Sequence, residues 1–206
     1  MRYPVVLLFL LSHTLSAQTS KGSFLVGGNA TADFTETNQE GASLKTFSLS
    51  VSPKAGYFVI DNFCIGTSLP LSVGKNKVFI EGSNPDKYEA DFSSWGLGPL
   101  VRYYFPINKF QIITEASYTW NKGKSEQNYY DVYTGQFSLE EIKTSINTFH
   151  AATGAGLLLS ENVMLEFLLN YQNIDSESEY PYGINEIKRN RLFFSIGFQI
   201  YLPKSE

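Results

Sequence analysis

Four ionisable side chains stand out as candidates for chemistry, because each occupies a polar position between apolar neighbours. They are Lys54, Arg102, Glu115 and Glu166. Two carboxylates held close together could work as a general acid and a general base, and a row of charges could line a gated ion path. Two cations and two anions could equally pair with one another, as charges removed from water must. Which of these three roles the four residues have depends on the secondary-structure elements that position them.

His150 is the second candidate, since it is the one histidine beyond the first 17 residues. A serine two positions later would supply a nucleophile on the same strand, but Ala152 stands there, and Ser145 and Ser160 lie too far along the chain. A lone histidine cannot build a multi-histidine zinc site, and Cys64, the only cysteine, cannot form a thiolate cage or an internal disulfide. We expect an inert, hydrogen-bonded histidine, with no metal and no cofactor.

The elements around these residues are indicated by alternation of apolar and polar residues. From Leu192 every second residue is apolar, while the residues between are mostly small or polar. Successive side chains of a strand point to opposite faces, so this pattern predicts a strand with one apolar face. Eight segments show it: 22–33, 46–59, 64–75, 93–105, 110–121, 146–159, 163–174 and 190–202.

The connections between these segments alternate in length. Tight ones are expected at 60–63, 106–109 and 160–162, and long polar ones at 34–45, 76–92, 122–145 and 175–189. Short turns on one side and long loops on the other are typical of an outer-membrane barrel, with turns in the periplasm and loops outside. An even number of strands then places both chain termini on the periplasmic side.

The alternation also predicts which residues face outward. Leu97, Val101, Ile112 and Phe167 fall on the apolar face, whereas the four charged residues fall on the polar face. Aromatic residues make up 15% of the chain and gather near the strand ends, as in the two interfacial belts of a membrane protein. A soluble barrel would turn the apolar face inward, and its outer face would then be poor in the charges that keep a surface soluble.

Residues 1–17 have the pattern of a secretory signal peptide. Arg2 supplies the positive charge, residues 5–11 form a short apolar run, and a small-residue cleavage site precedes Gln18. Residues 18–206 then form one barrel domain. No later stretch is apolar enough for a transmembrane helix, so a membrane protein of this sequence must be a barrel. A net charge of −4 without a Lys/Arg cluster argues against nucleic acid.

Two segments resemble a known family. Residues 52–58 (SPKAGYF) and 98–105 (GPLVRYYF) are similar to the second and fourth strands of the small outer-membrane β-barrel domains that include OmpA and OmpX. The resemblance implies an all-β, eight-stranded antiparallel transmembrane barrel with up-and-down meander topology. It also implies an assembly signal in the last strand, read by the barrel-insertion machinery. The signal residues would be Ser195, Gly197, Ile200 and Leu202, although Pro203 and three further residues follow where relatives often end on an aromatic residue.

These observations predict a small outer-membrane barrel without enzymatic activity or an open pore. Its lumen is plugged by the charged network, and its role is structural or interactive: envelope integrity, adhesion or partner binding through the loops. The expected partners are outer-membrane lipid, lipopolysaccharide and the insertion machinery, while the extracellular ligand is not identified. Three alternatives stay open: a narrow gated channel, a lipid-modifying outer-membrane enzyme and a soluble lipocalin-like binding barrel.

Overall fold

The computed structural model describes residues 19–39, 42–80, 89–107, 110–131, 136–180 and 183–203. The expected signal peptide, its cleavage site and Gln18 lie outside this part of the chain. Its regular structure is entirely β: β1 (Phe24–Gln39), β2 (Ala42–Ile60), β3 (Phe63–Ser68), β4 (Leu71–Ile80), β5 (Glu89–Ile107), β6 (Phe110–Asp131), β7 (Gln136–Ser160), β8 (Val163–Tyr180) and β9 (Gly183–Leu202).

No helix in the described part of the chain has the length and apolar character needed to cross a bilayer.

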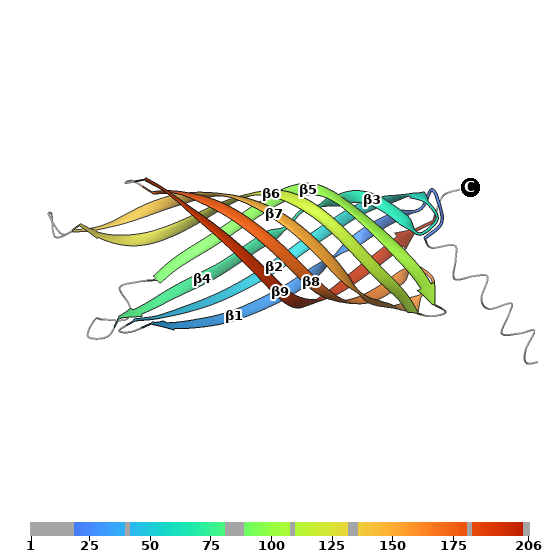
Figure 1. The fold of residues 1–206 in the computed structure, drawn as a ribbon, viewed down its shortest axis with the longest axis horizontal. Coiled ribbons are helices and arrows are strands. Elements are labelled where there is room, and N and C mark those ends of the chain that lie inside the picture. The colour runs from blue at the N-terminus through green and yellow to red at the C-terminus, as the bar shows by residue number, and fades with distance from the viewer. Residues whose placement is uncertain are drawn as a thin grey trace, which may run out of the picture.

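The strands form one closed antiparallel sheet, in which β9 pairs with β1 (Figure 1). β3 and β4 share one position in the ring, because both lie between β2 and β5 and their register continues across Leu69 and Pro70. The expected eight-stranded up-and-down barrel is therefore confirmed, with its third strand interrupted. Pro70 has no N–H to donate, but its carbonyl accepts from the Gly96 N–H at 2.9 Å.

The three tight connections are confirmed, and they mark one end of the barrel, which we call the turn end. At this end Asn62 adopts a positive φ of 65° in the turn between β2 and β3. The segment before β1 is bound there too: the Asn62 N–H donates to the Thr19 carbonyl at 2.7 Å, and the Phe58 N–H to the Ser23 carbonyl at 3.0 Å. The described part of the C-terminal strand ends on the same side (Figure 1).

The prediction of four long loops at 34–45, 76–92, 122–145 and 175–189 is wrong wherever the structure describes them, because paired strand occupies those residues. Residues 40–41, 81–88, 132–135 and 181–182 lie outside the described part of the chain. β6 pairs with β7 out to Asp131 and Gln136, and β8 with β9 out to Tyr180 and Gly183. Beyond the lipid both faces of a hairpin meet water, so the apolar alternation stops while the hydrogen-bonded ladder continues. We call this opposite end the hairpin end.

The two faces of the wall differ as the alternation predicts. Outward side chains are exposed, as at Leu97 (52%), Val101 (43%) and Phe167 (52%), whereas inward ones such as Arg102 and Glu166 are fully buried. The interior is thus filled by side chains and the exterior is apolar, which inverts the arrangement of a soluble protein.

The ladder between the first strand and the last is short. β1 pairs with β2 along its whole length but with β9 only from Phe24–Ala30 to Ile196–Leu202. Toward the hairpin end two side-chain contacts bridge this seam. Asn29 donates to Ser195 Oγ at 3.1 Å, and Arg191 lies 2.6 Å from the Asp33 carboxylate.

Candidate functional site

The four charged residues singled out in the sequence converge inside the barrel. Lys54 comes from β2, Arg102 from β5, Glu115 from β6 and Glu166 from β8, and none is more than 5% exposed. We call them the lumen network. Each occupies an inward position because the strand period of two places it opposite the lipid-facing residues.

Arg102 links both carboxylates of the lumen network. Its Nε donates to Glu115 Oε2 at 2.8 Å, its Nη2 contacts the same oxygen, and its Nη1 donates to Glu166 Oε1 at 2.7 Å. Lys54 Nζ donates to the other Glu115 oxygen at 2.5 Å. Every charge thus has an opposite partner at hydrogen-bonding distance, as charges removed from water require.

Neutral groups complete the coordination of this network. Gln199 Nε2 donates to Glu166 Oε2 at 3.1 Å, and Arg102 Nη1 also reaches the Tyr104 hydroxyl at 3.0 Å. Gly197, the cross-strand partner of Glu166, leaves space for the carboxylate, because a Cβ there would lie 3.2 Å from Oε2.

An aromatic layer fills the lumen on the turn-end side of the network. The rings of Phe58, Tyr104 and Tyr201 pack around one another with centroids 5.7–6.2 Å apart. The cluster also contains Leu25, Cys64, Ile113, Met164 and Leu168, all fully buried. Ions and apolar side chains therefore occupy successive levels of the same lumen.

His150 lies inward on β7, as expected, and is hydrogen-bonded. Its Nε2 is 2.9 Å from Asn170 Oδ1, its Nδ1 is 3.3 Å from Ser117 Oγ, and the same nitrogen is 3.5 Å from Glu115 Oε1. The absence of a serine two positions after His150 did not point to Ser117, which is the cross-strand partner of His150 on β6. The strand register was the missing information.

The contacts of His150 place a hydroxyl, an imidazole and an amide in a row, which is the order of a nucleophile, a base and an orienting group. Ser117 is 8% exposed and faces the lumen. Among the described residues no three His, Cys, Asp or Glu side chains gather closely enough to hold a metal ion.

The residues of the expected assembly signal divide between the two faces of β9. Ser195 is buried and accepts from Asn170 Nδ2 at 2.9 Å, and Gly197 lies beside Glu166. Ile200 and Leu202 face outward and are 38% and 48% exposed. The role of these residues in assembly stays a prediction.

With this fold and lumen, the chain belongs to the family of outer membrane protein β-barrel domains, whose family model matches residues 4–199. A search of curated proteins found no match. Among solved structures, the outer membrane protein OprG from Pseudomonas aeruginosa is 14% identical, with a TM-score of 0.60 over 92% of this chain and 99% of that one. That likeness shows a shared fold.

Two further structures are similar over most of their length. Neisserial surface protein A is 18% identical, with a TM-score of 0.45 over 87% of this chain and 99% of that one. A major outer membrane protein from Thermus thermophilus is 12% identical, with a TM-score of 0.45 over 88% and 99% of the two chains.

Family membership places this barrel in the outer membrane. Its exposed apolar side chains therefore face lipid, and the soluble lipocalin-like alternative does not apply.

Proposed function

We propose that this protein is a closed-lumen outer-membrane barrel, without enzymatic activity, whose role is structural or interactive and is carried by its hairpin end. The lumen network is the observation that supports this proposal. In an eight-stranded barrel the interior is just wide enough for side chains to fill. Four linked charges next to an aromatic layer leave an ion no hydrated route.

The hairpin end supplies a surface suited to contact with other molecules. Its strands stay paired beyond the apolar belt, and ion pairs connect neighbouring strands there. Lys75 Nζ lies 2.6 Å from Glu89 Oε1, and Lys124 Nζ lies 3.1 Å from Glu141 Oε2. A rigid, charged extension of the wall fits a role in envelope integrity, adhesion or partner binding better than a set of flexible loops would.

The row formed by Ser117, His150 and Asn170 is assigned to lumen packing. A lipid-modifying enzyme must reach ester or amide bonds outside the wall, whereas Ser117 is buried inside it. His150 Nδ1 also lies near the Glu115 carboxylate, so the imidazole extends the polar network. Lipid extracts from cells overproducing the protein should show the same masses as extracts from cells producing Ser117→Ala.

Planar-bilayer recording tests the closed lumen. The purified barrel should give no conductance steps, whereas Arg102→Ala combined with Glu166→Ala removes the central side chains and should open small ones. Val101→Ala, on the lipid face of the same strand, is the matched control and should stay silent. Regular single-channel steps from the unaltered protein would overturn the proposal in favour of a narrow gated channel.

We also propose the export route: residues 1–17 are removed as a signal peptide, and the insertion machinery reads Ser195, Gly197, Ile200 and Leu202. The outward position of Ile200 and Leu202 supports this assignment, because a strand presented to a partner can offer them directly. Intact mass measurement of the protein from outer membranes should give a chain beginning at Gln18.

A further inference from the structure

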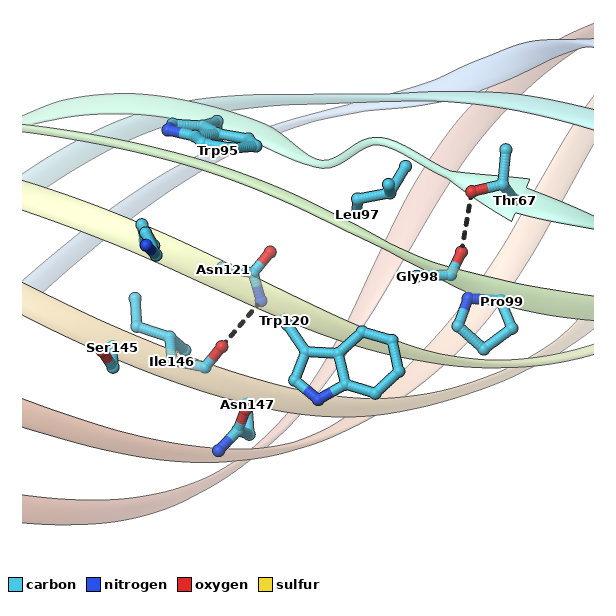
Figure 2. Close-up of a pocket in the computed structure, with 11 residues that line it drawn as sticks. Thr67, Trp95, Leu97, Gly98, Pro99, Trp120, Asn121, Ser145, Ile146 and Asn147 are labelled. Atoms are coloured by element: carbon cyan, nitrogen blue, oxygen red, sulfur yellow. Dashed lines mark hydrogen bonds between the residues drawn. The ribbon is translucent and has the colours of Figure 1, made fainter.

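The outer wall carries a groove of about 600 Å³ near the hairpin end (Figure 2). It spans β3, β5, β6 and β7, and its lining is mostly outward-facing. The residues on which its shape depends are Leu97, Pro99, Trp95, Trp120, Asn147 and Lys122. Trp95 and Trp120 are 57% and 59% exposed, so both rings stand on the lipid side of the wall.

The floor of the groove is formed where a ladder is interrupted. β5 and β6 are paired at Leu97–Trp120 and again at Leu100–Ser117, with a gap at Gly98 and Pro99. Pro99 donates no hydrogen bond, and the Gly98 carbonyl accepts instead from Thr67 Oγ1 at 3.0 Å, as Figure 2 shows. The Gly98 carbonyl is thus satisfied, and the proline ring forms part of an apolar depression.

The edge of the groove nearest the hairpin end is polar and positively charged. Asn147 and Ser145 follow Phe149 toward the hairpin end on the outward face of β7, and Lys122 follows Trp120 on β6. Counted from Phe110, Lys122 lies beyond the 9–11 or so residues that a strand needs to cross the hydrocarbon. Its ammonium group therefore sits at the level of lipid headgroups.

The positive charge at this edge is only partly balanced by its neighbours. Lys122 faces Trp95 on β5 and Ser145 on β7 and forms no ion pair among the described residues. Lys143 faces Lys124, which is paired with Glu141, and on its other side Glu179 of β8. Two lysines thus stay available above an apolar groove.

We propose that this groove binds a phosphate-bearing lipid of the outer leaflet, chemically of the lipid A type. One acyl chain lies along Leu97, Pro99 and Trp120, and Asn147 and Ser145 meet the polar linkages. The phosphate is bound by Lys122 and Lys143. Amphipathic indole rings at the mouth of the groove suit the boundary between acyl chain and headgroup.

Native mass spectrometry of the full barrel in detergent tests this site. The protein is titrated with bisphosphorylated lipid A and, in parallel, with lipid A lacking both phosphates. The unaltered barrel should retain the phosphorylated form preferentially. Lys122→Gln with Lys143→Gln should weaken that retention about fivefold or more and leave the dephosphorylated form unchanged, because each lysine near an anionic headgroup contributes independently.

Two controls separate this site from ordinary lipid solvation. Lys45→Gln with Lys188→Gln removes two outward lysines that are already paired with Glu36 and Asp175, and should change nothing. Asn147→Phe fills the groove and should reduce binding of both lipid forms, whereas Asn173→Phe, outward on β8, should not. Equal losses in the two lysine pairs, or no preference for phosphate, would overturn the proposal. Heat-modifiable migration verifies that each variant is folded.

Discussion

Arg102 is the residue that connects the two carboxylates of the lumen network. Its planar guanidinium reaches Glu115 and Glu166 at once, a geometry that the single ammonium of lysine cannot reproduce. Lys54 contacts Glu115 alone. Arg102 and Glu166 can therefore be replaced together by neutral residues, because Lys54 and Glu115 would still neutralise each other.

This arrangement gives a test by double substitution. Arg102→Met alone leaves Glu166 buried without its cation and should lower the free energy of unfolding by about 3–5 kcal/mol. Arg102→Met with Glu166→Gln removes both charges, leaves the Lys54–Glu115 pair intact, and should cost clearly less than the single change. Urea unfolding in lipid vesicles measures both. Equal midpoints for the single and double variants would show that the two residues are not coupled.

At the scale of the element, each strand consists of a lipid-spanning part and an extension into water. The spanning part of β5 carries its apolar residues at Leu97, Val101 and Tyr103, whereas its extension carries Asp91 and Glu89. β5 pairs with β6 in both parts, with a gap only at Gly98 and Pro99, so the same strand lies partly in lipid and partly in water.

The spanning part of β5 should not tolerate charge on its outward face. Val101 lies near the middle of the apolar belt, and Val101→Arg should lower the free energy of unfolding by about 2–4 kcal/mol. Ser93→Arg, also outward on β5 but close to the headgroups, should cost about 0–1 kcal/mol. Reversible unfolding in vesicles compares the two; equal losses would contradict the assignment of faces.

The extension of β5 should show a pH response. The hydrogen bond from Lys75 lowers the pKa of Glu89, and the same bond raises the pKa of Lys75. A carboxyl with a lowered pKa stabilises the folded hairpin above its unfolded pKa and loses that contribution as pH falls through the folded value; for the lysine the loss comes as pH rises. Carboxyl NMR titration should find the pKa of Glu89 below its ordinary value. Lys75→Met should raise this pKa, although Lys77, 3.4 Å from Glu89 Oε1, still lowers it. An unchanged midpoint in the variant would exclude the ion pair in solution.

The spanning strands and their faces could be predicted from sequence because lipid on one side imposes alternation. Val101 and Arg102 are adjacent in sequence and opposite in environment for that reason. The extensions of β6 and β7 could not be predicted in this way, since water wets both of their faces. The contact between Ser117 and His150 depends on strand register, which no single segment encodes. The interruption of the third strand at Pro70 is the opposite case: it depends on a single residue, because proline has no N–H to donate to the ladder.

At the scale of the whole molecule, the barrel has two unlike ends. An aromatic layer and the segment at residues 19–23 lie toward the turn end. At the hairpin end the strands extend as long hairpins (Figure 1), and ion pairs connect neighbouring strands there. Such asymmetry suits a protein that is closed toward the periplasm and acts toward the exterior.

This orientation predicts where tags become accessible. If the hairpin end lies outside, as we propose, a short epitope inserted between β6 and β7, at residues 132–135, should be labelled by antibody on intact cells. The same epitope inserted between Asp61 and Asn62 should be labelled only after the outer membrane is permeabilised. Labelling of the second insertion on intact cells would reverse the orientation.

The seam between β1 and β9 determines the order in which such a wall can be completed. With β3 and β4 counted as the one interrupted strand that they form, every other ladder joins strands that follow one another in the chain, so it closes a shorter loop. The seam joins Phe24 to Leu202 and has seven residue pairs. Closing the longest loop costs the most chain entropy, and here only these seven residue pairs offset it. We therefore expect closure between β1 and β9 to be the last step of folding.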